Sequence, residues 1–227
     1  MDEFFDIKKK EYIYIIGAGG KTSLMNYLLD FYLSRKKKCF ITTTTKIGKN
    51  QITAPVVFDK EKIANGCCYV RSEILENKLT GFEPEYLDEI YNNSDYSIIV
   101  EADGAKMKPL KFPNINEPVV SKNASKIFLV LGLDSLNKKL SPDIFHRLDL
   151  FLETFPGFKT SGTITFEMFN KIIGVYYDKS PVKNFYLLLN KIDECKEDIE
   201  TIKNKFKKFS FPSALSSFKE KKFERIK

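Results

Sequence analysis

Short apolar runs and amphipathic segments alternate along the chain. Apolar, aromatic and β-branched residues fill Tyr12 to Ile16, a composition typical of a buried strand. A glycine turn follows, and then Leu24, Leu28 and Tyr32 recur at helical spacing before a second apolar run, Cys39 to Ile41. Strand, helix and strand in this order form a βαβ unit, which implies a parallel sheet covered by helices.

The later segments continue this pattern. Gln51 to Ser72 indicates short strands and a turn, and a long polar connection runs from the end of the next strand to Ser125. Loops of this length are usually functional or disordered. The further predicted elements are strands at 97–100, 127–131 and 185–189, and helices at 83–91, 143–153 and 165–173.

No internal repeat or linker interrupts the pattern. We therefore predict one unit over residues 1–227, with a basic helix and tail from about residue 194. The expected fold class is α/β: a doubly wound, mostly parallel sheet in a three-layer sandwich like that of P-loop NTPases.

Composition and charge narrow the class of protein. The chain has 227 residues, 43% hydrophobic and 30% charged, and a net charge of +7. Its longest apolar runs are far below the roughly 18 residues of a membrane helix, and acidic residues stand where a signal peptide would be positive. We expect a cytoplasmic protein without a membrane partner. Nucleic acid is not the expected partner, because the arginines that usually recognise phosphate are scarce.

Cysteine and histidine are too few for a zinc site of these ligands. The sequence has four cysteines, no Cys-x-x-Cys pair and one histidine, whereas structural zinc needs four clustered ligands. We expect Cys67 and Cys68 to alternate between the faces of a short strand as small apolar residues. A redox or selenium-handling pair is the alternative.

A glycine-rich loop between the first strand and helix is the strongest chemical signal. Small residues let backbone N–H groups surround a polyphosphate, while the helix directs its positive end at it. Lys21 would contact the β- and γ-phosphates, and Thr22 would offer its hydroxyl to Mg²⁺. Ile15 stands where the full Walker motif has its first glycine, so the loop resembles the shorter one of Mur-type ligases. The predicted phosphate-binding residues are Gly17, Ala18, Gly19, Gly20, Lys21, Thr22 and Ser23.

Acidic residues end a neighbouring strand. Glu101 and Asp103 follow the apolar run Ser97 to Val100, as in a Walker-B strand. One carboxylate would hold Mg²⁺ and the other orient an attacking group. In the run Thr42 to Thr45, Thr43 is a further candidate, so the predicted metal ligands are Thr22, Thr43, Glu101 and Asp103. The alternative is that these are ordinary polar strand ends.

A third motif follows the strand at 185–189. Asn190, Lys191 and Asp193 resemble the Asn-Lys-x-Asp motif with which GTPases read guanine, because a carboxylate accepts from the guanine N1 and N2 donors. Ser213 and Ala214 resemble the companion loop that supports the base. The motif favours GTP slightly over ATP, with a chance match as the alternative.

The segment from Val100 to Val120 is the most individual stretch of the sequence. Together with the glycine loop, the threonine run, Gly132-Leu-Asp134 and His146-Arg147, it is similar to the YqeC family. The resemblance implies a role in maturing a selenium-dependent molybdenum hydroxylase. The implied partners are a selenium or molybdopterin cofactor species and the client enzyme. Met107 departs from the family pattern, which has a basic residue there.

Basic residues of this region gain a possible role beside the glycine loop. Lys106, Lys108 and Lys111 could close over the terminal phosphate or an anionic second substrate, with Glu117 as their anchor. His146 could serve as an acid or base and Arg147 could clamp transition-state charge. The alternatives are a solvated lysine loop and a His-Arg pair with a packing or surface role.

The predicted function combines these motifs. We expect Mg²⁺-dependent binding of GTP or ATP, with hydrolysis or phosphoryl transfer. The expected catalytic residues are Lys21, Asp103, Lys106, His146 and Arg147. A nucleotide-gated cofactor chaperone with negligible turnover and a small-molecule kinase with a Mur-like loop are the alternatives.

Overall fold

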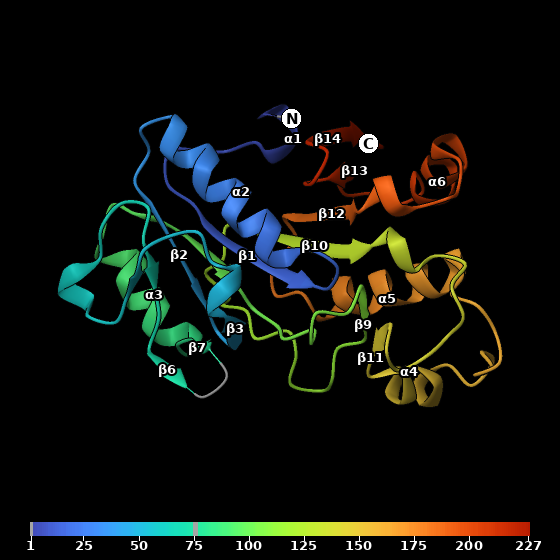
Figure 1. The fold of residues 1–227 in the computed structure, drawn as a ribbon. Helices are drawn as coiled ribbons and strands as arrows, with labels where there is room; N and C mark the ends of the chain where they lie inside the picture. Colours follow the sequence, from blue (N-terminus) through green and yellow to red (C-terminus); the bar gives the residue numbers. More distant parts are fainter. Residues whose placement is uncertain (1, 75–76) are drawn as a thin grey trace.

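Across the described residues, 2–74 and 77–227, the computed structural model is built around a nine-stranded, mostly parallel sheet (Figure 1). Its strands are β1 (Tyr12–Gly17), β2 (Cys39–Thr43), β4 (Val56–Val57), β5 (Cys68–Tyr69), β8 (Ser97–Glu101), β10 (Lys126–Gly132), β12 (Phe185–Asn190), β13 (Ser213–Ser217) and β14 (Lys222–Arg225). They lie in the order β14-β13-β12-β10-β1-β8-β2-β5-β4. Neighbours pair in parallel, except that β13 and β14 are antiparallel.

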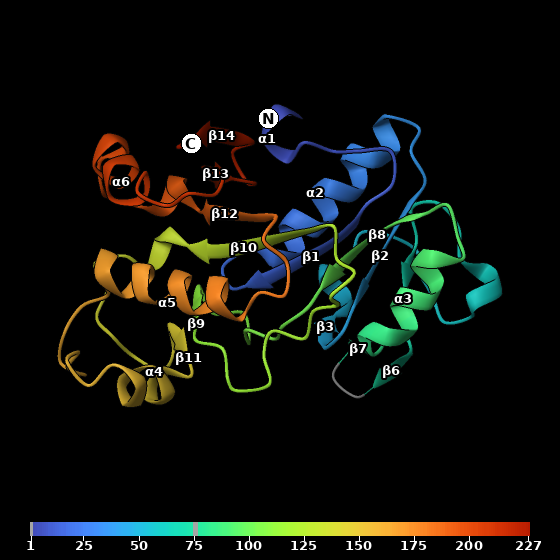
Figure 2. The same cartoon turned by 180° about the vertical axis from the view of Figure 1, so that it is seen from behind.

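Helices cover both faces of this sheet, as Figures 1 and 2 show from opposite sides. The helices are α1 (Asp2–Phe5), α2 (Lys21–Ser34), α3 (Pro84–Asn92), α4 (Leu148–Thr154), α5 (Phe166–Lys179) and α6 (Ile199–Phe206). α1 and α2 pack on one face, where Leu24, Leu28 and Phe128 belong to one core. The other four helices pack on the opposite face, where Leu87 and Ile172 belong to a second core. The predicted three-layer α/β architecture is therefore confirmed.

The sheet is wound in two directions from its centre. β1 lies between β10 and β8, and the chain proceeds outward to β2 on one side and to β12 and β13 on the other. Ligands bind at the carboxyl ends of strands where the strand order reverses in this way. Parallel register brings Gly17, Thr43 and Glu101 to that edge.

Two small sheets lie beyond this edge (Figure 1). One contains β3 (Lys46–Gly48), β6 (Ser72–Ile74) and β7 (Lys78–Thr80), and the other pairs β9 (Leu110–Lys111) with β11 (Phe145–His146). Short 3₁₀ turns follow some of the strands: η1 (Lys49–Gln51), η2 (Lys60–Lys62), η3 (Leu133–Ser135) and η4 (Ile192–Glu194). These elements supply side chains that no strand of the main sheet could place there.

Several element boundaries differ from the prediction. The helix expected at 143–153 begins only at Leu148, because β11 occupies the first residues and Arg147 adopts a left-handed φ of 62°. The helix expected at 165–173 extends to Lys179, and Thr165 caps it by accepting from the Met168 N–H. The predicted tail instead adds β13 and β14 to the sheet. The small polar sequence of β13 lacks the apolar run that marks the other strands.

Within the described part of the chain, no helix has both the length and the apolar character needed to cross a membrane.

Replacing Phe128 by alanine tests the core beneath α1 and α2. Its ring is fully buried and contacts those of Phe5 and Tyr186. We expect Phe128→Ala to lower the free energy of unfolding by about 3–5 kcal/mol, measured by urea denaturation. Phe58→Ala is the control, because Phe58 is 48% exposed and should cost no more than about 0.5 kcal/mol. Equal losses would contradict this assignment of the core.

Candidate functional site

The glycine loop ends with an uncapped helix start. α2 begins at Lys21, and no side chain caps it at Gly20. Gly19 and Gly20 have φ values of +80° and +131°, and a Cβ atom on Gly19 would lie 2.4 Å from the Gly132 nitrogen. Only glycine fits this conformation at such close packing. The first N–H groups of α2 therefore open toward the space beyond the sheet edge, where an anion would be favoured.

The start of the loop is fixed from within the protein. The Gly17 N–H donates to Asp103 Oδ1 at 3.0 Å, and the Ala18 N–H donates to the Val130 carbonyl at 2.8 Å. Both residues are buried. The expectation that Gly17 and Ala18 offer their N–H groups to phosphate is therefore wrong, because those donors already have partners. These residues shape the loop, whereas Gly19 to Ser23 line a cavity.

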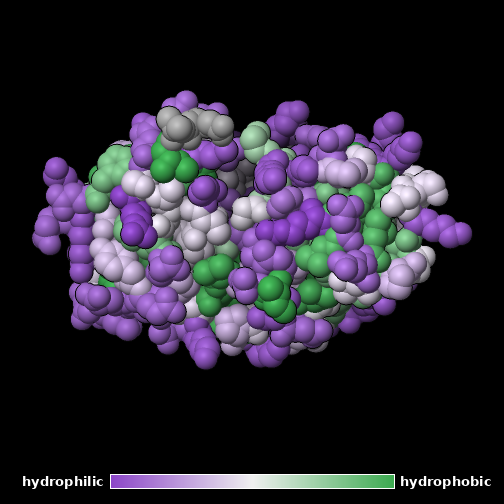
Figure 3. All heavy atoms as spheres, turned by 90° about the horizontal axis from the view of Figure 1, so that it is seen from below, coloured by the Kyte–Doolittle hydropathy of each residue, from purple (hydrophilic) through white to green (hydrophobic). Residues whose placement is uncertain are grey.

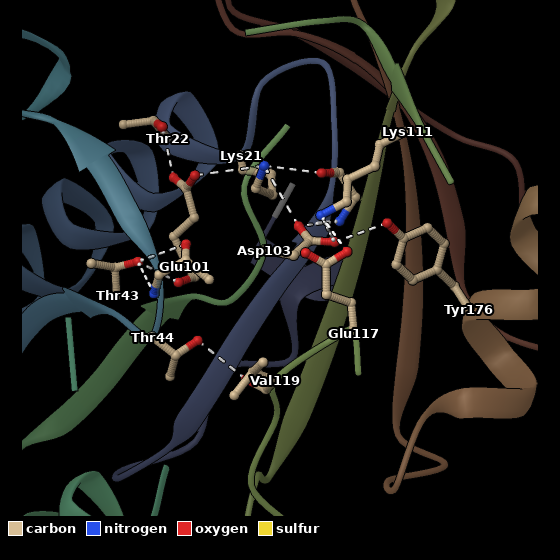
Figure 4. Close-up of polar contacts among 12 residues, drawn as sticks. Lys21, Thr22, Thr43, Thr44, Glu101, Asp103, Lys111, Glu117, Val119 and Tyr176 are labelled. Atoms are coloured by element: carbon tan, nitrogen blue, oxygen red, sulfur yellow. Dashed lines mark hydrogen bonds and ion pairs between the residues drawn. The ribbon is translucent and has the colours of Figure 1, made fainter. Parts of the chain in front are cut away.

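Lys21, Thr22 and Glu101 form the cavity-facing part of the site (Figure 4). Lys21 Nζ donates to the Gly17 carbonyl at 2.9 Å and lies 3.6 Å from Glu101 Oε1. The Thr22 hydroxyl donates to Glu101 Oε2 at 2.7 Å. A hydroxyl and a carboxylate side by side are the oxygen ligands that Mg²⁺ prefers. The structure thus brings Thr22 and Glu101 together at the cavity, and metal binding by this pair stays a prediction.

Asp103 has a different role from Glu101. Its side chain is fully buried, and its Oδ2 accepts from the Tyr176 hydroxyl at 2.8 Å while Oδ1 accepts from Gly17. Its carboxylate also lies 3.6 Å from Lys21 Nζ and 3.4 Å from Lys111 Nζ. Asp103 therefore cannot contact a substrate or a metal in this arrangement. The prediction of Asp103 as a catalytic residue and metal ligand is wrong; it positions the loop.

Tyr176 is a residue of this site that the sequence did not reveal. It comes from α5 and is fully buried. Burial, and then the negative charge of Asp103, raise the pKa of Tyr176 well above its usual value, so the hydroxyl stays a hydrogen-bond donor. Helical spacing marks a tyrosine here only as a core residue.

Thr43 is also withdrawn from the cavity. Its fully buried hydroxyl donates to the Glu101 carbonyl at 2.8 Å and accepts from the Thr45 N–H at 3.0 Å. The predicted metal-ligand role of Thr43 is wrong, because this hydroxyl ties the ends of β2 and β8 together. Thr44 donates to the Val119 carbonyl, and only Thr45 of the run lines the cavity.

Ion pairs extend from Asp103 to the loop after β8. Lys111 is fully buried between Asp103 and Glu117, with 2.9 Å separating its Nζ from Glu117 Oε2. Arg147 binds both oxygens of Glu117, with Nη2 3.0 Å from Oε1. Lys179 donates to the carbonyls of this loop, including that of Glu117. The ammonium group of Lys111 is therefore buried in ion pairs and is not exposed to solvent. Glu117 anchors the loop, as predicted.

The pKa of Glu117 reflects these contacts. Burial alone would raise it, but the hydrogen bonds and charges of Arg147 and Lys111 outweigh burial and lower it. Positive and negative side chains consequently alternate through the site. In order they are Glu101, Lys21, Asp103, Lys111, Glu117 and Arg147.

A cavity of about 1160 Å³ lies over the glycine loop. On one flank are the loop 104–108, His146 and Arg147; on the other are Asn26, residues 45–51 apart from Lys49, and residues 77–78. The structure thus brings the predicted residues Lys106, His146 and Arg147 to the same cavity as Lys21. The underside of the molecule is largely hydrophilic, with hydrophobic groups interspersed (Figure 3).

His146 is electrostatically unusual. Burial, followed by the charges of Arg147, Lys111, Lys106 and Lys108, lowers its pKa to about 4. The imidazole is therefore neutral at pH 7. The lowered pKa favours a base over an acid in the free protein at neutral pH, and both roles of His146 stay predictions.

The Asn-Lys-x-Asp motif is only partly associated with the cavity. Asn190 Nδ2 donates to the Gly19 carbonyl at 2.8 Å, and its Oδ1 accepts from the Ser216 hydroxyl at 3.1 Å. Lys191 lines the cavity and pairs with Asp134 at 2.9 Å, whereas Asp193 is exposed on η4 and does not line it. Asn190 thus supports the glycine loop. Guanine recognition by Asp193 stays a prediction.

Ser213 and Ala214 do not form the predicted base-supporting loop. They lie buried within β13, opposite Leu187 and Leu188, whereas Asn190 pairs with Ser216. The prediction is wrong because the parallel register places Ser216, and not Ser213, at the sheet edge beside the motif.

Besides the glycine loop, two other possible sites would be a cluster of metal ligands and the neighbouring thiols of Cys67 and Cys68. Over the described residues, no group of three or more His, Cys, Asp or Glu side chains is placed to hold a metal ion. Cys67 and Cys68 are buried, and burial raises the thiol pKa of Cys68 to about 12. A protonated thiol is a poor nucleophile, so this pair behaves as the small apolar residues that we expected.

Comparisons with known proteins identify one group of relatives. The sequence model of the YqeC family, described as "YqeC protein", matches residues 13–149. The "Uncharacterized protein YqeC" of Escherichia coli (strain K12) is 31% identical over 156 residues, which cover 64% of this chain and 61% of that protein. The alignment thus spans about three fifths of the relative's length. No solved structure matches the chain.

Removing the Tyr176 hydroxyl tests the role assigned to Asp103. Tyr176→Phe leaves Asp103 Oδ2 without this buried donor, which should lower the free energy of unfolding by about 1–3 kcal/mol. The matched control is Tyr177→Phe on the same helix, because Tyr177 contacts its described neighbours through its ring, beside Phe185 and Phe211. Chemical denaturation of both variants measures the difference. Equal stability would show that the Tyr176 hydroxyl does not stabilise the carboxylate.

The pKa of His146 predicts a pH dependence of stability. Between about pH 6.5 and 4 the unfolded chain binds a proton at this residue that the folded chain does not, so acidification favours unfolding. We expect the free energy of unfolding of the wild type to fall more steeply over this range than that of His146→Gln. Parallel pH profiles from urea denaturation would contradict the lowered pKa.

Proposed function

This chain belongs to the YqeC family, and on that premise we propose that it binds a purine nucleoside triphosphate with Mg²⁺ and hydrolyses or transfers its terminal phosphoryl group. One observation carries the proposal. The uncapped start of α2, Lys21 and the Thr22–Glu101 pair all open into one cavity at the switch point of a parallel sheet.

Phosphate binding is assigned to the second half of the glycine loop. The N–H groups from Gly19 to Ser23 lie at the positive end of a fourteen-residue helix and would donate to phosphate oxygens. Lys21 is 5% exposed and lines the cavity. Its ammonium now rests on the Gly17 carbonyl and would turn to the β- and γ-phosphates when they are present.

The residues present fit Mg²⁺ held jointly by protein, phosphate and water. Thr22 and Glu101 would supply two oxygen ligands, and the ion would neutralise charge on the transferring phosphoryl group. Mg²⁺ usually keeps several waters and one or two carboxylates instead of a complete protein cage. The donor set of Thr22 and Glu101 matches that pattern.

Catalysis would come mainly from positioning and charge. Phosphoryl transfer requires little covalent chemistry of the protein, so fixed N–H groups and cations supply most of the rate enhancement. Asp103 and Asn190 would act as positioning residues, because they hold Gly17 and Gly19 from behind. Lys106 and Arg147, which are among the other cations that line the cavity, would stabilise transition-state charge.

The cellular role rests on the family resemblance. We propose that nucleotide turnover supports maturation of a selenium-dependent molybdenum hydroxylase in the cytoplasm, with a selenium or molybdopterin species and the client enzyme as partners. Support comes from the segment 100–120 and the other shared motifs. The family match includes the glycine loop, Glu101 and Arg147, and ends before Asn190.

Thermal stability with Mg²⁺ and either GTP or ATP tests nucleotide binding. At a hundred times the dissociation constant, a ligand stabilises the folded state by roughly 2.7 kcal/mol, which should raise the melting temperature by about 5–10 °C. We expect Lys21→Met and Thr22→Ala to lose most of this shift. Lys122→Ala should retain it, because Lys122 is exposed and does not line the cavity.

The choice of nucleotide decides the role of Asp193. A shift with GTP alone that Asp193→Ala abolishes would support guanine recognition, whereas an equal shift with ATP would exclude it. No shift with either nucleotide would contradict the proposal and favour a chaperone that requires its partner.

A further inference from the structure

The cavity exceeds the usual size of a site for one small ligand, and cationic side chains line both of its flanks. Sites for single small ligands usually measure about 300–1,000 Å³, compared with about 1160 Å³ here. One flank carries the amides of Asn26, Asn50 and Gln51 together with the lysines Lys46 and Lys78. The opposite flank, which we name the cationic wall, consists of Lys106, Lys108, His146 and Arg147.

We propose that the cationic wall is a subsite for a second ligand, a small oxyanion that is either free or the phosphomonoester group of a small metabolite. This subsite rests on the proposed function, because it assumes that the nucleotide binds at the glycine loop and leaves the cationic wall for the second ligand. It would make the protein a two-ligand enzyme in place of a simple nucleotide hydrolase.

Charge compensation within the site leaves the wall with unpaired cations. Asp103 and Glu117 neutralise Lys111, and Glu117 also holds Arg147. Among the described residues, Lys106 and Lys108 have no recorded carboxylate partner, and Lys108 donates only to the Pro142 carbonyl. Unpaired lysines facing a cavity attract an anionic ligand.

Two residues of the cationic wall, Arg147 and His146, are held in place by their neighbours. Glu117 orients the Arg147 guanidinium through both of its oxygens, and Lys179 fixes the backbone that carries Glu117. β9 and β11 pair beside it, so His146 and Lys111 lie at matching positions. A rigid arrangement lowers the entropic cost of binding a small ligand. These supports act on Arg147 and His146, whereas Lys106 lies exposed on the loop beside them.

His146 makes the wall directly observable. It is the only histidine of the chain, so its imidazole gives an unambiguous signal in NMR spectra of the whole protein. The charged groups around it are Arg147, Lys111, Lys106 and Lys108, together with Glu117, which pairs with two of them. An anion among these cations would favour the protonated imidazole and raise its titration midpoint.

The experiment follows the His146 titration in the full chain saturated with Mg²⁺ and a non-hydrolysable triphosphate. We expect inorganic phosphate to raise the His146 midpoint above that of the nucleotide-bound protein, toward the usual value for histidine, and calorimetry at pH 7 to detect phosphate binding. Lys106→Gln/Lys108→Gln should weaken phosphate binding at least tenfold and nucleotide binding less than threefold. Lys122→Gln is the control and should change neither. Glycerol 3-phosphate binding at least tenfold tighter than phosphate would identify a phosphomonoester as the ligand.

Three results would overturn the subsite. In the first, phosphate leaves the titration midpoint of His146 unchanged. In the second, the nucleotide alone shifts this midpoint as much as phosphate does. In the third, the double variant loses nucleotide affinity and phosphate affinity to the same extent. Failure of the proposed function is distinguishable from these. If the triphosphate does not bind but phosphate still shifts His146 through Lys106 and Lys108, the subsite stands and nucleotide binding fails.

Discussion

The buried carboxylate of Asp103 is the contact on which the candidate site depends. It receives the Gly17 N–H and the Tyr176 hydroxyl and lies between the ammonium groups of Lys21 and Lys111. A charge so deeply buried is tolerated only when it is paired and hydrogen-bonded. Each partner comes from a different element: the end of β1, the helices α2 and α5, and β9. The conformation of the glycine loop is therefore set by residues far apart in the sequence.

This arrangement separates positioning from chemistry. One group of buried residues contacts only other protein groups through its polar atoms. Its members are Asp103, Lys111, Thr43 and Asn190. Lys21, Thr22 and Glu101 remain at the cavity, where the helix start is uncapped. A loop held from behind in this way has its N–H groups oriented before any ligand arrives, which is what electrostatic catalysis of phosphoryl transfer needs. The same ion pairs continue through Glu117 to Arg147, so the cationic wall and the glycine loop share one support.

Much of the fold could be predicted from the sequence, because apolar runs and helical spacing mark β1, α2, β8, β10 and β12 directly. The roles of individual side chains at the sheet edge could not be predicted in this way. Glu101 and Asp103 are both strand-end acids, and only tertiary packing decides that one faces the cavity and the other the core. Thr43 and Thr45 differ in the same way. The predicted role of Ser213 is wrong because the strand register, which the sequence does not show, brings Ser216 to the edge instead. Tyr176 carries no signal beyond that of a core residue, since its partner lies in another element.

A crystal structure of the chain with Mg²⁺ and a non-hydrolysable purine triphosphate would show whether the glycine loop binds phosphate while Asp103 holds that loop from behind. We expect β-phosphate oxygens on the N–H groups between Gly19 and Ser23, the metal on Thr22 and Glu101, and Asp103 still bound to the Gly17 N–H. Triphosphate bound only to Lys106, Lys108 and Arg147, or a metal on Asp103, would contradict this expectation.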